Sequence, residues 1–276
     1  MMDFGRQVVC REIEAPVDES AFVAFEKEFE QVMAKGTEIS QSIPGGDTWG
    51  EIIPPREKLL EYFLRLQALE LTPESEYIDI ASCMSLFPSY VAERVGCKVS
   101  RQDFLYTEGI HEREFPKCFA DGKTTMRCIG SDGCTLPLED SSVDAITLHC
   151  SFEHFEDNKD MLFANDALRV LRKGGKLLII PFYCGDKGVE VFHEEYAPGC
   201  QFHRYYDPGT FTGRVLAHLN YPFSLELRHY PNSRQIDDSF YCDLSMVIKK
   251  EGAGFAIKNH LAEIHELLKM RYRWMP

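Results

Sequence analysis

Polar side chains stand at the carboxyl ends of four predicted strands. The first four of five short apolar runs end at or beside Asp79, Asp103, Asp132 and His149. A carboxylate in such a position can accept hydrogen bonds from ribose hydroxyls, and an imidazole with a near-neutral pKa can accept a proton from a hydroxyl. Ligands of open α/β sheets bind beyond the carboxyl ends of the strands, where the strand order reverses. The four residues therefore predict one ligand site along one edge of a sheet.

Strands that alternate with helices predict an α/β fold with parallel strands and right-handed crossovers. We expect strands near 77–81, 98–103, 127–131, 144–149, 176–182, 223–230 and 241–249. We expect helices near 86–95, 157–172 and 208–219. The helix over 157–172 is well marked, because Asp157 can cap its start and Arg172-Lys173-Gly174 can close its end.

The segment from Gly130 to Tyr183 combines an acidic turn, a buried strand, an acidic helix start, a Gly-Gly helix stop and a second apolar strand. Within it, LPLEDSSVDAITL is similar to the Leu-Pro-Phe-x-Asp-x-Ser-Phe-Asp run of class I S-adenosylmethionine (SAM) methyltransferases of the type 11-like group. The resemblance covers roughly residues 75–250. It implies a doubly wound, seven-stranded, mostly parallel sheet with an antiparallel last strand. It also implies SAM as cofactor and methyl transfer to a small polar acceptor, such as a sugar-type or other hydroxyl.

The first loop departs from the family pattern. The family's acidic-x-Gly-x-Gly-x-Gly loop corresponds here to Asp79 followed by Ala81, Cys83 and Ser85, so small residues replace all three glycines. A left-handed backbone would cost such a residue roughly 1–2 kcal/mol, which a loop with negative φ throughout would avoid.

Two later loops match the family more closely. The resemblance assigns Asp103 to the ribose hydroxyls, with a turn-forming aspartate as the alternative. It assigns Asp132 to the adenine amino group, with the Gly133 amide beside the ring. The expected cofactor-binding residues are Asp79, Ala81, Ser82, Cys83, Asp103, Ser131, Asp132, Gly133 and His149.

Histidines are the candidates for proton transfer. Methyl transfer from a sulfonium is an in-line displacement that depends mostly on alignment, but a hydroxyl acceptor must also lose a proton. The expected catalytic residues are His149, His154 and His203. The alternatives are a hydrogen-bonded core position for His149 and a role in covering the cofactor for His154.

An insert over 184–206 occupies the place of the family's acceptor-recognition segment and predicts an irregular lid. Its Arg204 could pair with a carboxylate or phosphate. His193-Glu194 with His203 could hold a metal, but the spacing fits no familiar metal site, so we expect none.

Residues 1–72 predict a helical extension before the methyltransferase domain of residues 73–250, and residues 251–276 predict a C-terminal helix. In the extension, a helix over 18–35 is capped by Asp18 or Ser20 and ends before Gly36, and a second helix covers 56–70. The apolar stripe of the first helix contains Phe22, Phe25 and Phe29. This stripe could pack on the chain's own core or on a partner, so a homodimer is possible. Asp47, Trp49 and Glu51 lie in the link between the helices and could reach over the site, or Trp49 could anchor the extension.

Composition excludes several function classes. A net charge of −14 without a dense basic stripe disfavours nucleic acid as a partner. No apolar run long enough for a membrane span and no secretory signal occur, so we expect a cytoplasmic protein. The ten cysteines contain no C-x-x-C pair and predict thiols rather than disulfides or structural zinc.

Two other functions compete with methyl transfer. The glycine-free first loop could belong to a methyltransferase-like binding or scaffold protein without turnover. A nicotinamide-dependent oxidoreductase would need a G-x-G-x-x-G after the first strand, which this chain lacks.

Overall fold

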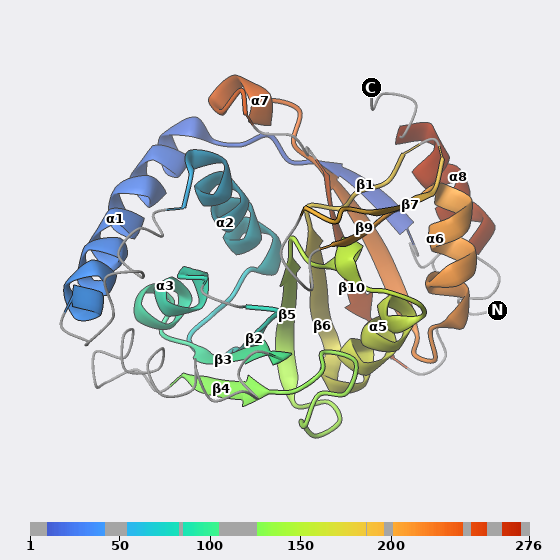
Figure 1. The fold of residues 1–276 in the computed structure, drawn as a ribbon, viewed down its shortest axis with the longest axis horizontal. Coiled ribbons are helices and arrows are strands. Elements are labelled where there is room, and N and C mark those ends of the chain that lie inside the picture. The colour runs from blue at the N-terminus through green and yellow to red at the C-terminus, as the bar shows by residue number, and fades with distance from the viewer. Residues whose placement is uncertain are drawn as a thin grey trace, which may run out of the picture.

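One mixed sheet of eight strands forms the centre of the protein (Figure 1). The computed structural model describes residues 10–41, 54–82, 85–104, 126–185, 187–195, 201–239, 244–252 and 261–271. The strand order is β1-β9-β10-β6-β5-β2-β3-β4. The strands are β1 Cys10–Glu14, β2 Glu76–Ile80, β3 Lys98–Asp103, β4 Arg127–Gly130, β5 Val143–His149, β6 Leu171–Ile180, β9 Phe223–His229 and β10 Leu244–Lys250.

The strand order reverses between β2 and β5. From β2 the chain adds β3 and β4 on one side, and it then returns to add β5 and β6 on the other side, all in parallel. The register pairs Ile80 with Leu148, so the carboxyl ends of β2 and β5 lie next to each other. The predicted α/β fold is confirmed, and β10 runs antiparallel between β6 and β9 as expected for the last strand.

Helices cover both faces of the sheet (Figure 1). One face carries α1 Glu19–Gln41, α2 Arg56–Leu69 and α3 Phe87–Arg94, and the other carries α5 Lys159–Val170, α6 Pro208–Arg214 and α8 Leu261–Arg271. The short α7 spans Ser233–Ile236. Neighbouring residues of a strand point to opposite faces, so Tyr77 belongs to the core under α1–α3 and Ile78 to the core under α5, α6 and α8.

The N-terminal extension is an integral part of this fold. Its residues Cys10–Glu14 form β1, which pairs in parallel with β9 at the sheet edge, so the expected seven strands become eight and the extension is not purely helical. The sequence CREIE is half exposed and charged, so its apolar alternation is too weak to predict a strand. The helix α1 continues through Gly36 to Gln41, beyond the expected end.

The aromatic stripe of α1 packs within its own chain. Phe25 contacts Tyr90 of α3 with ring centroids 5.0 Å apart, and Phe22 contacts Phe63 of α2 at 5.6 Å. Phe29 is fully buried between the same helices. A homodimer stays a prediction, and this stripe is not the surface that would form it.

The region around α5 differs from the expectation. Asp157 does not cap the helix, because its φ of 49° is left-handed and α5 begins only at Lys159, after Asn158. Arg172, Lys173 and Gly174 do not close the helix either, since β6 begins at Leu171, which pairs with Val143.

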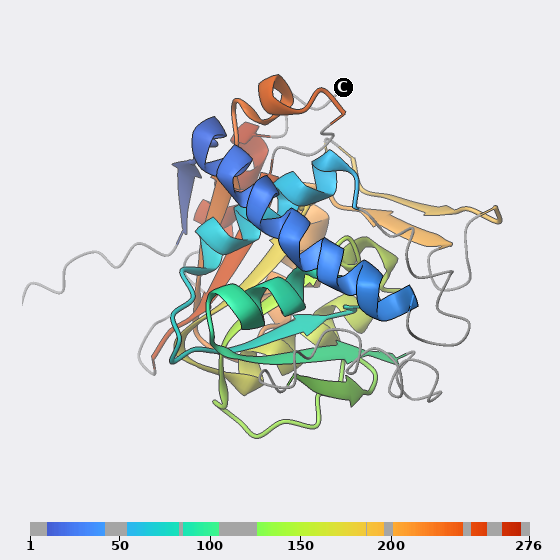
Figure 2. The same cartoon turned by 90° about the vertical axis from the view of Figure 1, so that its left-hand side faces the viewer.

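The 184–206 insert contains regular structure. It holds the antiparallel pair β7 Val189–Phe192 and β8 Phe202–Tyr205, which extends away from the body of the protein (Figure 2). The expected helix over 208–219 is α6 followed by a separate turn at Leu216–His218. Among the described helices, none has the length and apolarity that crossing a bilayer requires.

Candidate active site

The carboxylate of Asp79 lies inside the fold at the end of β2. It forms an ion pair with Arg65 of α2, and both residues are almost fully buried. Thr147 and Tyr77 also donate to Oδ1, and the Ser82 hydroxyl donates to Oδ2 at 3.0 Å. Since these four groups engage both oxygens, Asp79 ties α2 to the carboxyl ends of β2 and β5.

The loop after β2 begins with a left-handed residue. Ala81 has a φ of 51°, so the loop does not avoid the strained conformation that the missing glycines would have adopted freely. The Ala81 amide donates to the Gln102 side chain at 3.3 Å, and Gln102 donates in turn to the Ser131 carbonyl. Gln102 therefore joins the loops after β2 and β4. Cys83, Asp47, Trp49 and Glu51 lie outside the described residues.

The two acids expected around the adenosine lie at neighbouring strand ends. Asp103 ends β3, is nearly buried, and pairs in register with Gly130 of β4. Asp132 follows β4 with a half-exposed side chain. A hydrogen bond from the Cys134 amide at 2.9 Å lowers the pKa of Asp132 and outweighs the effect of partial burial. Gly133 lies against Ile80, and a Cβ there would meet its side chain at ordinary contact distance.

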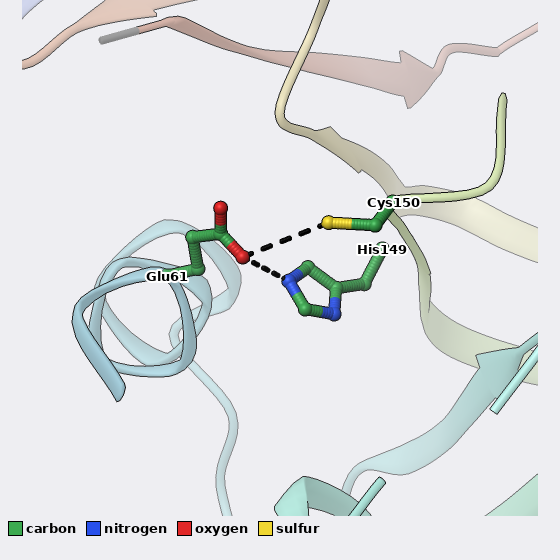
Figure 3. A group of neighbouring side chains, drawn as sticks. All are labelled: Glu61, His149 and Cys150. Atoms are coloured by element: carbon green, nitrogen blue, oxygen red, sulfur yellow. Dashed lines mark hydrogen bonds and ion pairs between the residues drawn. The ribbon is translucent and has the colours of Figure 1, made fainter. Parts of the chain in front are cut away.

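A cluster of four polar side chains lies on the other side of the reversal point. Glu61 of α2 points toward the His149 ring and the Cys150 sulfur at the end of β5 (Figure 3). Glu61 is fully buried, and His149 Nε2 contacts its Oε2. The Lys58 ammonium lies 3.0 Å and 3.2 Å from the two Glu61 oxygens and 3.1 Å from Cys150 Sγ.

Charges within this cluster shift two pKa values. Burial favours the neutral imidazole, but the Cys150 sulfur and the Glu61 carboxylate outweigh it and raise the pKa of His149 to about 9. Burial likewise works to raise the pKa of Glu61, but His149 and Lys58 outweigh it and lower that pKa. At neutral pH the cluster therefore pairs the Glu61 carboxylate with two cations, Lys58 and the His149 imidazolium.

His154 and His203 belong to a separate histidine cluster. The His154 and His203 rings lie 4.4 Å apart, and His193 lies 5.0 Å from His203. His154 Nδ1 is 2.9 Å from the Phe202 carbonyl of β8, so this contact joins the insert to the turn Phe152–His154. Burial and the charges of its two histidine neighbours lower the pKa of His203. The structure thus brings these two candidates to each other rather than to His149.

Arg204 pairs with carboxylates of its own chain rather than with those of an acceptor, the role that we expected for it. Its Nη1 lies 3.0 Å from Asp160 of α5, its Nε lies 2.9 Å from Glu190 of β7, and its side chain is almost fully buried. Tyr206 and Arg214 also donate to the fully buried Asp160. This buried cluster attaches the β7–β8 pair to α5 and α6.

Several residues of the site were not predicted from the sequence. Lys58, Glu61 and Arg65 are spaced three and four residues apart on α2, so they share one face of that helix. The sequence feature that could have indicated them is this row of charged residues within a helix whose residues are mostly buried. Gln102, directly before Asp103, was also missed.

Comparisons with known proteins agree with this architecture. Residues 78–179 match a family model described as a methyltransferase domain, whereas no curated protein sequence matches the chain. The chain is similar to the Burkholderia thailandensis 1,6-didemethyltoxoflavin-N1-methyltransferase, with 14% identity, a TM-score of 0.50, and coverage of 87% of this chain and 94% of that one. It is also similar to Haemonchus contortus phosphoethanolamine N-methyltransferase 1, with 14% identity, a TM-score of 0.53, and coverage of 93% and 55%. At these identities the structural likeness shows the fold.

The matched segment spans the reversal of strand order and contains Asp79, Asp103, Asp132 and His149. Residues 78–179 therefore form a methyltransferase domain. The fold around it is the one shared by the two similar methyltransferases.

Proposed function

We propose that this enzyme transfers the methyl group of SAM to a hydroxyl of a small polar acceptor bound at the carboxyl end of β5. In this proposal, Asp103 binds the ribose, Asp132 and Gly133 bind the adenine, and the sulfonium points toward His149. The observation that carries it is the polar cluster at His149, across the reversal point from the strand ends with the two acids. A ligand that extends along these strand ends would bring its reactive end to that cluster.

The character of the cluster supports a polar acceptor. Lys58, Glu61 and His149 offer hydrogen-bond donors and acceptors, which a polar molecule can use and an apolar one would leave unpaired. The two similar enzymes act, by their names, on 1,6-didemethyltoxoflavin and phosphoethanolamine. Both molecules are small and polar, which supports the size and polarity of the acceptor, although both enzymes methylate nitrogen.

A methyl-transfer screen tests this function. The protein is incubated with SAM carrying a labelled methyl group and with small alcohols, sugars, amines and thiols, and S-adenosylhomocysteine and labelled product are quantified. We expect product from a hydroxyl compound. Product from amines alone would contradict the hydroxyl assignment, and an absence of product with every acceptor, despite bound SAM, would favour the scaffold function.

His149→Gln is the matching variant. It keeps a polar side chain of similar reach but cannot reproduce the two ring nitrogens, so we expect at least about a hundredfold lower turnover at saturating SAM. Arg11→Gln is its control, because Arg11 pairs with Glu226 on the outer strands and lies far from β5 in the sheet. Turnover equal to that of the parent in His149→Gln would remove His149 from the site.

A further inference from the structure

We propose that Glu61, His149 and Cys150 bind a divalent transition-metal ion of the zinc type, with one coordination position open to the acceptor. The inference rests on the proposed function only for the role of that open position. Among the described residues, these three form the one group whose carboxylate, imidazole and thiol donor atoms all lie within 4.8 Å of one another. Glu61 comes from α2, His149 is the last residue of β5, and Cys150 follows it directly in the chain (Figure 3).

The spacing of the donors suits one small ion. Cys150 Sγ and Glu61 Oε2 are 3.7 Å apart. Two ligands of a tetrahedral zinc ion, with a sulfur at about 2.3 Å and an oxygen at about 2.0 Å, are separated by about 3.5 Å. His149 Nε2 already contacts the same Glu61 oxygen and needs to move apart only to the corresponding separation. Small side-chain rotations would therefore complete the site without a change in the backbone.

The chemistry of the donors selects the class of ion. Thiolate and imidazole suit zinc and related transition metals, whereas magnesium and calcium prefer an all-oxygen set. Three protein ligands with a fourth position left open are typical of catalytic zinc sites, and structural sites have four. The sequence predicts no metal here because Glu61 lies 88 residues from His149 and joins it only when α2 packs on the sheet.

Lys58 is the group that competes with the metal. Its ammonium contacts both Glu61 oxygens and Cys150 Sγ, so a cation already lies against two of the three donors. The Lys58 side chain is 24% exposed and can turn toward solvent. Metal binding would thus replace one cation by another, while Cys150 and any protonated His149 release their protons to water.

The open position gives the metal a role in methyl transfer. A hydroxyl acceptor that binds there loses its proton to solvent more readily, because the ion stabilises the resulting alkoxide. The oxygen lone pair then attacks the SAM methyl carbon as the carbon–sulfur bond breaks, which yields a methyl ether and neutral S-adenosylhomocysteine. In this arrangement His149 holds the ion and need not act as the base.

Cobalt(II) provides a direct test with the full-length protein after removal of metals by a chelator. A Co²⁺–thiolate bond produces a charge-transfer absorption band in the near ultraviolet, which oxygen and nitrogen ligands do not. We expect one equivalent of Co²⁺ to produce this band, Zn²⁺ to abolish it by displacement, and Cys150→Ser to lack it. Cys10→Ser, on the distant strand β1, should keep the band and is the matched control.

Lys58→Met provides the second variant. Because it removes the competing ammonium, we expect the band to remain and Co²⁺ to bind roughly tenfold more tightly. A band that persists in Cys150→Ser would overturn the proposal, as would the absence of a band in both the parent and Lys58→Met. SAM binding is measured on the same samples: a missing metal with normal SAM binding would contradict only the metal site. A bound metal without methyl transfer to any acceptor would contradict only the proposed function.

Discussion

Arg65 and Asp79 illustrate how a single residue pair positions the site. Both side chains are almost completely removed from solvent, and the guanidinium lies 3.8 Å over the Phe87 ring. A charge buried in this way is tolerated only with a partner, so each residue depends on the other. Their contact fixes α2, and with it Glu61, against the ends of β2 and β5.

Removal of one partner should therefore be costly. We expect Arg65→Met to lower the free energy of unfolding by about 3–5 kcal/mol, because Asp79 would remain buried without its cation. Urea denaturation measures the change. Lys98→Met is the control: its pair with Glu76 is largely exposed, so we expect less than about 1 kcal/mol. Equal losses of unfolding free energy in the two variants would show that the buried ion pair stabilises the fold no more than an exposed one.

The left-handed backbone at Ala81 predicts a stabilising substitution. Its φ of 51° costs an alanine roughly 1–2 kcal/mol, and glycine relieves this strain but gains about 0.5–1 kcal/mol of unfolded-state freedom. We expect Ala81→Gly to raise the free energy of unfolding by about 0.5–1 kcal/mol. We expect Gly174→Ala to lower the free energy of unfolding. Its φ of 84° is left-handed and no atom lies within 4 Å of an added Cβ, so backbone strain is the only cost in the folded state. Destabilisation by Ala81→Gly would contradict this account of the loop.

The positions of individual site residues could be predicted only where the local sequence pattern determines them. Asp79, Asp103, Asp132 and His149 were assigned to strand ends because strand periodicity is local, and the structure confirms those places. The partners Lys58, Glu61 and Arg65 could not be assigned, because their contacts form only when α2 docks on the ends of β2 and β5. Asp79 lies 14 residues from Arg65, and His149 lies 88 residues from Glu61. Whether Asp103 and Asp132 bind SAM stays a prediction.

At the scale of elements, Asp207 predicts a pH dependence. It caps α6 by accepting from the Gly209 and Thr210 amides at 2.7 Å and 2.9 Å, and it also accepts from the Gly188 amide of the insert. Burial works to raise the pKa of Asp207, but the hydrogen bonds of Thr210, Gly188 and Gly209 outweigh it and lower that pKa below its ordinary 3.8.

The sign of the effect follows from the lowered pKa. The stabilisation by the carboxylate is fully present above pH 3.8 and is lost as the pH falls through the lower folded-state value. We expect Asp207→Asn to be less stable than the parent at pH 7 and the two unfolding free energies to converge as the pH falls below 3.8. Denaturation curves collected over this range provide the measurement, and a constant difference would contradict a role for the charge.

The packing of α1 predicts that the extension unfolds with the domain. Phe29 is fully buried against Tyr62 and Tyr90. We expect Phe29→Ala to cost about 3–5 kcal/mol in a single cooperative transition seen by both fluorescence and circular dichroism. Phe192→Ala is the matched control, because that ring on β7 is exposed. Two separate transitions would indicate an independent extension.

Helices and strands were predicted correctly where the apolar pattern repeats over several residues, and they were missed for short strands at the edge of the sheet and in the insert. The strand Lys98–Asp103 was predicted at its observed bounds, and Asp18 caps α1 through the Ala21 amide as expected. The strands β1, β7 and β8 were missed, because short exposed strands lack a strong apolar alternation. The pairing partner of β1 is also more than 200 residues away, so no local pattern could specify it.

At the scale of the whole molecule, one topological feature organises the site. The reversal of strand order brings the carboxyl ends of β2, β3 and β4 to one side and that of β5 to the other. Helix α2 covers the junction and supplies Arg65 to the first side and Glu61 to the second. In the proposed function, the cofactor and the acceptor bind next to each other across this reversal, as the alignment of an in-line displacement requires.

Calorimetric titration with S-adenosylhomocysteine, for the parent and for Asp103→Ala, tests this arrangement most directly. We expect the parent to bind with a dissociation constant in the micromolar range, about −8 kcal/mol, and Asp103→Ala to bind at least about tenfold more weakly with an unchanged melting temperature of the ligand-free protein. Equal affinity in the two proteins, or no binding to the parent, would contradict the placement of the cofactor along β2, β3 and β4.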